Sequence, residues 1–249
     1  MAGMILAGGR GGAPYATEAD MGRDLAGRTI VVLGGSGNLG RAVVDRLGAD
    51  GATVVVADSR HPEPADRPPG VEHVVVDALD EDSVAGVLAA VSPAPWAVVN
   101  LVGGYTPPQP LAELDTGVLR HQLELNLLTA AIVTKHALPV LTAAGGGRIV
   151  HTSSRVATQT GENGFAYSVS KLAVLRLVEA AAAEGREAGV TVNCILPSII
   201  DTPPNRAAMP RADHDRWPKP AELAAVLSFL VSDDAGLISG AAIPVYGRA

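Results

Sequence analysis

Tyr167 and Lys171 are the side chains whose types and spacing best suit acid–base chemistry. Residues four apart lie on one face of a helix, one turn from each other. A phenol loses its proton at about pH 10, and a neighbouring ammonium lowers that pKa towards the range of efficient general acid–base catalysis. Taken alone, the pair also fits a surface tyrosine beside a solvated lysine.

Ser154 adds a hydroxyl thirteen residues before Tyr167, directly after an apolar run at residues 147–152 that predicts a strand. This layout resembles the short-chain dehydrogenase/reductase family, over nearly all of the chain from about residue 25. The resemblance implies that Ser154 orients a carbonyl oxygen while Tyr167 exchanges its proton. It also implies that Lys171 lowers the pKa of the phenol and binds the nicotinamide ribose.

The composition predicts an α/β protein. The chain has 249 residues, enough for one large domain, and 47% of them are apolar with few aromatics. Such a composition suits a buried parallel sheet. The strands predicted along the chain and the family resemblance together imply a Rossmann-type doubly wound sheet of about seven strands in a single domain. The net charge of −7 carries no basic block, so neither nucleic acid nor a membrane is an expected partner, and a small-molecule substrate is.

The cysteine and histidine content indicates the cellular compartment and whether a metal site is expected. Cys194 is the only cysteine, so no intrachain disulfide forms, which is compatible with a cytoplasmic location. The six histidines are scattered without ligand spacing, and no metal site is expected. No apolar stretch reaches the roughly 20 residues that span a bilayer. Residues 1–24 are rich in glycine and alanine, and we expect a mobile tail before a domain at residues 25–249.

A glycine-rich turn lies between an apolar run at residues 29–33 and an amphipathic stretch at residues 41–47. Strand, glycine turn and helix form the context of a dinucleotide-binding motif, in which backbone amides approach a pyrophosphate. The candidate positions are Gly34, Ser36, Gly37, Asn38, Leu39 and Gly40. The family usually has a further glycine where this chain has Asn38, so the motif is divergent. The same residues do not fit the G-x-S-x-G elbow of hydrolases.

Two acidic residues follow the next predicted strands. Asp58 lies eighteen residues after Gly40, where a carboxylate binds a ribose 2′-hydroxyl and repels a 2′-phosphate. It therefore favours NAD over NADP, although Arg60 is placed to reach such a phosphate. Asp77, followed by Ala78, resembles the adenine-contacting acid of the family, and it fits a turn or N-cap residue equally well.

Two further segments resemble the cofactor cleft of the family. Residues 100–104 resemble its Asn-Asn-Ala-Gly segment, which assigns Asn100, Val102 and Gly103 to the cofactor site. Residues 197–202 resemble Pro-Gly-x-x-x-Thr, with a serine in place of the glycine. There, Pro197, Ile200 and Thr202 would line the nicotinamide, and the resemblance places the backbone near Ile200 and the Thr202 hydroxyl at its carboxamide.

The long segment 111–141 is predicted to be mostly helical and contains Asn126 among leucines. A buried amide is unfavourable unless it is hydrogen-bonded, and the family resemblance places Asn126 in the proton relay with Lys171. In the family, this helix and the one predicted at residues 166–185 build the subunit interface. The chain is therefore expected to be a homotetramer or homodimer.

Residues 203–218 are polar and rich in proline, and we expect them to form a lid over the substrate. Met209 and Trp217 from this lid, with Tyr105 and Ser154, are the candidate substrate residues. The lid resembles the matching segment of dihydropteridine reductases, which lack the serine at position 154. Hydride transfer between NAD(P)(H) and a carbonyl or alcohol is the main prediction. Reduction of a quinonoid or C=N substrate and non-catalytic nucleotide sensing remain alternatives.

Overall fold

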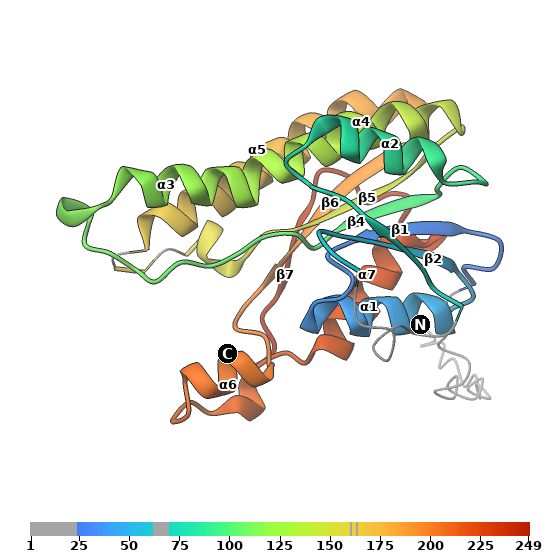
Figure 1. Cartoon of the computed structure of the whole chain (residues 1–249). Helices are drawn as coiled ribbons and strands as arrows, with labels where there is room; N and C mark the ends of the chain where they lie inside the picture. Colours follow the sequence, from blue (N-terminus) through green and yellow to red (C-terminus); the bar gives the residue numbers. More distant parts are fainter. Residues whose placement is uncertain (1–23, 62–69, 160, 163) are drawn as a thin grey trace, which may run out of the picture.

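The computed structural model describes residues 24–61, 70–159, 161–162 and 164–249, so nearly all of the expected N-terminal tail lies outside the described residues. Seven parallel strands form one sheet in the order β3-β2-β1-β4-β5-β6-β7 (Figure 1). The strands are β1 (Thr29–Leu33), β2 (Thr53–Asp58), β3 (Glu72–Val75), β4 (Ala97–Asn100), β5 (Gly147–Thr152), β6 (Val190–Pro197) and β7 (Ala242–Val245). The predicted fold class is confirmed.

Helices cover both faces of the sheet. They are α1 (Asn38–Ala49), α2 (Glu81–Ala90), α3 (Thr116–Leu123), α4 (Thr129–Ala143), α5 (Phe165–Gly185), α6 (Pro203–Ala208) and α7 (Pro220–Val231). Helices α2, α4 and α5 lie on one face, and α1 and α7 lie on the other (Figure 1). Because the central strands are buried on both sides, their sequences are nearly continuous runs of valine, isoleucine and leucine.

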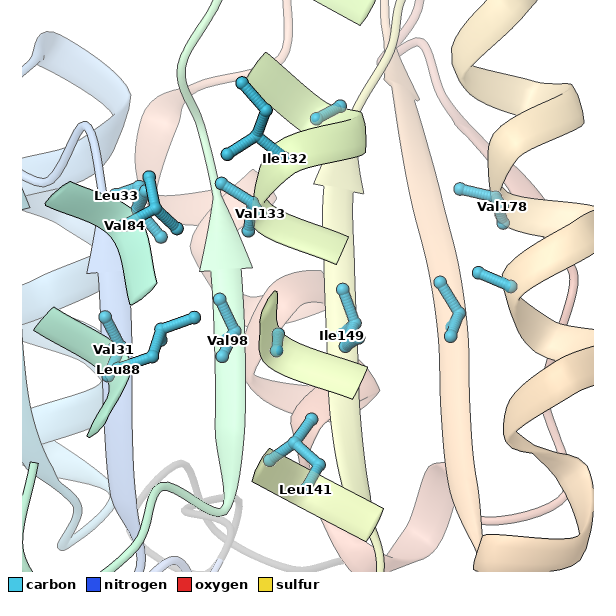
Figure 2. Packing of buried hydrophobic residues seen from close by; sticks show 14 of the residues in the cluster. Val31, Leu33, Val84, Leu88, Val98, Ile132, Val133, Leu141, Ile149 and Val178 are labelled. Atoms are coloured by element: carbon cyan, nitrogen blue, oxygen red, sulfur yellow. The ribbon is translucent and has the colours of Figure 1, made fainter. Parts of the chain in front are cut away.

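The first face packs through branched side chains from strand and helix alike. Val31, Val98 and Ile149 of the sheet meet Leu88 of α2 and Val133 of α4 (Figure 2). All of these side chains are fully or almost fully buried. This core holds β4, β5 and α4 at fixed positions. Several candidate site residues lie in the segments next to these elements, among them Ser154 just after β5 and Asn126 just before α4.

The strand order reverses direction at β1. From β1, the chain builds β2 and β3 on one side and then crosses to β4 on the other. In open parallel sheets the crevice at the carboxyl ends of such strands is the ligand site. The glycine turn after β1 and the turn after β4 face this crevice.

The segment 111–141 is mostly helical, as predicted. After a 3₁₀ turn (Leu111–Glu113), one helical run consists of α3, a π-helical turn (Glu124–Leu128) and α4. The apolar run at residues 238–245 predicts a last strand over its whole length, but β7 begins only at Ala242. The preceding residues form a turn in which Gly240 has a φ of 78° and Ser239 Oγ accepts a hydrogen bond from the Val192 amide.

Within the described residues, one helical run, Thr116–Ala143, is long and apolar enough to cross a membrane by length and composition. This corrects the expectation that no apolar stretch reaches that length. In its most apolar window, 44% is buried inside the protein. Ala130, Val133 and Leu141 pack against the sheet, so the run has the character of a core helix.

Candidate active site

Ser154, Tyr167 and Lys171 meet at the carboxyl end of β5. Ser154 follows this strand by two residues, and Tyr167 is the third residue of α5. The Tyr167 phenol is hydrogen-bonded to the Ser154 side chain. Lys171 lies one turn further along α5, with its ammonium 6.0 Å from the centroid of the Tyr167 ring. The structure therefore brings together the three side chains that their spacing in the sequence singled out.

Lys171 is almost completely buried, with 4% of its surface exposed. Its Nζ donates a hydrogen bond of 3.0 Å to the Thr152 carbonyl, and its own carbonyl accepts one of 2.8 Å from Ser153 Oγ. Burial lowers the pKa of Lys171 to about 8, because the charged ammonium is removed from water. Lys171 can therefore change its protonation state near neutral pH.

The pKa of Tyr167 is raised, which corrects the expectation that Lys171 lowers it. Burial of the phenol is the main cause, and the negative charge of an ionised Tyr105 would raise it further. The hydrogen bond from Ser154 acts in the opposite direction and is the smaller effect. The Lys171 ammonium is bonded to the Thr152 carbonyl rather than to the phenol oxygen, so it does not offset the burial. Tyr167 is therefore a protonated acid at neutral pH.

The Asn126 side chain holds the turn after β4. Its Oδ1 accepts from the Gly104 amide at 2.9 Å, and its Nδ2 donates to the Gly104 carbonyl at 3.0 Å. Nδ2 also lies 3.1 Å from Ser170 Oγ and 3.2 Å from Gln122 Oε1. A Cβ on Gly103 would lie 2.7 Å from Asn126 Oδ1 and 2.8 Å from Lys171 Nζ. A larger side chain at position 103 would therefore displace the Asn126 amide or the Lys171 ammonium.

Gln122 and Ser170 were not identified from the sequence. Gln122 is buried on α3, one helical turn before Asn126, and Ser170 directly precedes Lys171. A glutamine four residues before Asn126 in an apolar helix was the available signal, because two buried amides at that spacing can bond to each other.

The glycine turn packs more tightly than its sequence alone shows. A Cβ on Gly40 would lie 2.2 Å from the Gly34 carbonyl oxygen, and Gly34 itself has a φ of 80°. Gly37 precedes α1 and has no side chain to cap the first amides of the helix. Asn38 and Leu39 begin α1, where such amides are placed to bind a phosphate.

Asp58 borders a cavity of about 280 Å³ at the carboxyl ends of β1, β2 and β4. Gly34, Gly37, Asp58, Ala78, Val102 and Gly103 are among its lining residues. Asp58 Oδ2 accepts a hydrogen bond of 2.8 Å from the Ser36 amide. Ser36 Oγ is buried and has no partner among the described residues. An unpartnered hydroxyl beside a glycine cradle and a carboxylate fits the phosphates and ribose of a dinucleotide.

Asp77 occupies the turn before α2. Its Oδ1 accepts from the Leu79 amide at 2.9 Å, and its own amide donates to Ser83 Oγ at 3.1 Å. These bonds match the turn role that the sequence left open. The neighbouring Ala78 lines the cavity.

The segment after β6 is built around Thr202. Thr202 is buried, and its Oγ1 caps α6 by accepting from the Asn205 amide at 3.4 Å. The Ile200 carbonyl accepts from Asn205 Nδ2 at 2.8 Å. Pro197 ends β6 next to this segment. As an acceptor, Thr202 Oγ1 keeps its own proton available to a ligand.

A second cavity of about 200 Å³ lies beside the Tyr167 phenol. Tyr105, Pro107, Leu114, Val118, Val156 and Tyr167 are among the residues that line it. The Tyr105 ring meets the Tyr167 ring edge to face at 5.3 Å between centroids. These walls are mainly apolar.

The lid residues are placed differently from the prediction. Within the described part of the chain, neither Met209 nor Trp217 lines this cavity. Trp217 is only 6% exposed, and its ring packs on His214 at 4.6 Å. Arg206 forms two hydrogen bonds with Asp201, of 2.5 and 2.8 Å. Trp217 therefore belongs to the core of its segment, because its large apolar ring is buried there.

The chain matches the family model for short chain dehydrogenases over residues 28–212. It is 35% identical over 246 residues to cis-4-hydroxycyclohexanecarboxylate dehydrogenase of Sinomonas cyclohexanicum, covering 91% of this chain and 98% of that one. It is 32% identical over 230 residues to 3-oxoacyl-acyl-carrier-protein reductase MabA of Mycobacterium tuberculosis, covering 88% and 92%.

Among solved structures, a short-chain type dehydrogenase/reductase from Mycobacterium ulcerans superposes with a TM-score of 0.83. The two chains are 30% identical, and the match covers 90% of each. This solved relative agrees with the seven-stranded parallel sheet and its flanking helices. The chain belongs to the short-chain dehydrogenase family and is an NAD(P)-dependent oxidoreductase of small-molecule alcohols or carbonyls.

Proposed function

We propose that Ser154, Tyr167 and Lys171 are the catalytic residues of this oxidoreductase. NAD(P)H supplies the hydride when it is bound. Ser154 orients the carbonyl oxygen of the substrate, and Tyr167 donates the proton that this oxygen takes up. The observation that carries the proposal is the Tyr167 phenol, hydrogen-bonded to Ser154 and facing the apolar cavity, with buried Lys171 one turn away.

Lys171 and Asn126 assist the proton transfer from Tyr167 without contacting the substrate carbonyl. The Lys171 ammonium is held by the Thr152 carbonyl, where it can donate to a ribose hydroxyl and pass a proton towards Tyr167. Asn126 holds Gly104, and so positions Tyr105 against Tyr167. The raised pKa keeps Tyr167 protonated, which is the form that donates a proton in carbonyl reduction.

We further propose NAD as the preferred cofactor. Asp58 presents a carboxylate to the cavity that fits the ribose, and this charge repels a 2′-phosphate. In titrations followed by fluorescence, NADH should bind more tightly than NADPH, and Asp58→Ala should narrow that difference. Asp45→Ala is the control, because Asp45 is an exposed acid on α1, and this variant should leave the difference in affinity unchanged. Tighter binding of NADPH by the wild type would show that Arg60 determines the cofactor.

The substrate cavity favours a compact and mainly apolar substrate, because it is small and lined by proline, leucine and valine side chains. A ring-sized ketone or secondary alcohol fits it. A panel followed by NADH absorbance should include a 4-oxocyclohexanecarboxylate, its methyl ester, a 3-oxoacyl thioester and quinonoid dihydropterin. Best turnover with a cyclic ketone supports the proposal. Best turnover with the dihydropterin would favour the resemblance of the lid to dihydropteridine reductases.

The proposed assembly is a homodimer or homotetramer in the cytoplasm. A groove of about 610 Å³ runs between α4 and α5, and Leu138, Leu177 and Ala181 are among its lining residues. Leu172, also on α5, is 42% exposed. A second copy of the same helices is the partner proposed for this mainly apolar groove. The single buried Cys194 suits a reducing compartment.

A further inference from the structure

A buried chain of hydrogen bonds connects α4 with the turn after β4. It runs through Thr134 of α4, His151 of β5 and Asn100 at the end of β4. Only 1% of His151 is exposed, and the other two side chains are also buried. None of these three side chains lies in the catalytic cluster. Their polar atoms nevertheless form a continuous path to the cofactor cavity.

The direction of the bonds near the cavity is set by the backbone. The Val102 amide can only donate, and it lies 3.1 Å from Asn100 Oδ1. This contact fixes the orientation of the Asn100 amide, so its Nδ2 faces His151 Nδ1 at 3.3 Å. Because Nδ2 can only donate, His151 Nδ1 must accept.

At the Thr134 end of this series of hydrogen bonds, the donor and acceptor roles are also fixed by the backbone. The Ala130 carbonyl can only accept, so Thr134 Oγ1 donates its proton there at 2.8 Å. The Thr134 oxygen then accepts from His151 Nε2 at 2.9 Å. His151 is therefore the neutral tautomer with its proton on Nε2, and both ring nitrogens are satisfied. A second proton on Nδ1 would face the Asn100 amide, donor against donor.

The turn that this chain holds forms a wall of the cofactor cavity. Leu101, Val102 and Gly103 all line it, opposite Gly34 and Gly37. A Cβ on Gly34 would lie 3.3 Å from both the Val102 nitrogen and the Leu101 carbonyl carbon. The two turns are already in close contact, so a shift of Val102 would change the width of the cavity directly.

We propose that His151 is a positioning residue for cofactor binding. It holds Asn100, and through it the turn from Leu101 to Gly103, with Thr134 as its anchor on α4. His151 does not itself line the cavity among the described residues. The inference rests on the proposed dinucleotide site and adds the residues that set its geometry.

The test compares cofactor affinities of full-length variants, measured by NADH fluorescence titration. His151→Leu removes both ring nitrogens at similar volume. His151→Asn is the conservative variant, because its amide oxygen can stand near the position of Nδ1 and accept from Asn100. Thr134→Val removes only the anchor. Thr191→Val is its matched control, since Thr191 is also buried but its hydroxyl has no partner among the described residues.

His151→Leu should weaken NADH binding by about 10-fold or more, as expected when a buried hydrogen-bonding group loses its partner. Thr134→Val should weaken it by about 5-fold, while His151→Asn and Thr191→Val remain within about 3-fold of the wild type. A folded His151→Leu protein that binds within 3-fold of the wild type would overturn the inference. So would a His151→Asn protein as weak as His151→Leu.

If His151→Leu does not fold, the comparison of Thr134→Val with Thr191→Val decides, and equal affinities would overturn the inference. The proposed cofactor preference fails separately, through tighter binding of NADPH by the wild type. In that case the same variants are titrated with NADPH, and the positioning role of His151 is tested as before.

Discussion

At the scale of single residues, burial determines the chemistry of the site more than the neighbouring charge does. Tyr167 and Lys171 are both removed from water, and burial moves each pKa towards the neutral form of its group. The phenol therefore keeps its proton, and the amine can release its own near neutral pH. Ser154 acts on the phenol by a hydrogen bond and needs no charge.

The first prediction concerns the phenol of Tyr167. Tyr167→Phe keeps the ring in contact with Tyr105 and removes only the proton donor. Turnover of the best panel substrate should fall by about 10²-fold or more, the scale of lost general acid catalysis. NADH affinity should stay close to that of the wild type. Unchanged turnover would show that Tyr167 is not the acid.

The second prediction concerns the stability of the fold below neutral pH. Burial and the nearby Lys171 lower the pKa of His151 to about 4, from its ordinary value of 6.5. Between these values the unfolded histidine binds a proton and the folded one does not. The stabilisation is therefore complete above pH 6.5 and is lost as the pH falls towards 4.

Urea denaturation at pH 7 and pH 5 measures this effect. Between these two values the wild type should lose about 2 kcal/mol more than His151→Asn, which has no titrating ring. Other groups with shifted pKa values, such as the Asp201 carboxyl, contribute equally to both proteins. Parallel losses in the two proteins would mean that His151 is protonated in the fold.

At the scale of elements, the glycine turn is a packing requirement as well as a ligand site. The first turn of α1 crosses directly over the end of β1, so the Gly34 carbonyl meets the position of a Cβ on Gly40. The π-helical turn at Glu124–Leu128 has a comparable purpose, because it places Asn126 opposite Gly104. In each case the backbone departs from regular strand or helix geometry, and the departure determines the position of one residue, Gly40 or Asn126.

The third prediction compares a glycine of α1 that is required by packing, Gly40, with one that is not, Gly48. Gly40→Ala places a methyl 2.2 Å from the Gly34 oxygen, so the backbone must move. It should destabilise the fold by about 1–3 kcal/mol and weaken NADH binding. Gly48→Ala in the same helix has no atom within 4 Å of its new Cβ and should stabilise by up to about 1 kcal/mol. Thermal melts and NADH titrations measure both effects, and equal behaviour of the two variants would contradict this account.

At the scale of the whole molecule, one sheet with two covered faces still leaves an apolar groove open between α4 and α5. Thr134 of α4 is one of the residues that line this groove, and Lys171 of α5 lies in the candidate active site. The same pair of helices therefore contributes both to the proposed interface and to the site.

The fourth prediction is that the protein is a dimer or tetramer at micromolar concentration, measured by light scattering. Ala180→Arg adds a charge within the groove at an exposed helical position and should shift the mass towards the monomer. Ala89→Arg makes the same change at an exposed alanine of α2 and should leave the mass unchanged. A monomeric wild type would refute the proposed interface.

The sequence by itself determined the features that depend on local pattern. Apolar runs predicted strands such as β1 and β5, although β7 begins later than its apolar run. The four-residue spacing of Tyr167 and Lys171 predicted that they share one face of a helix. That Ser154 joins them was implied by the family resemblance. The glycines predicted the turn after β1, since a close approach of two backbones needs residues without Cβ.

Only the tertiary structure decided the features that depend on long-range contacts. Trp217 was expected over the substrate and is buried beside His214, because burial depends on how a segment folds back. The pKa of Tyr167 was expected to fall and instead rises, because the surroundings of a side chain are not contained in its spacing from one lysine. The partners of His151 lie 17 and 51 residues away, and they became neighbours only when β4, β5 and α4 packed together.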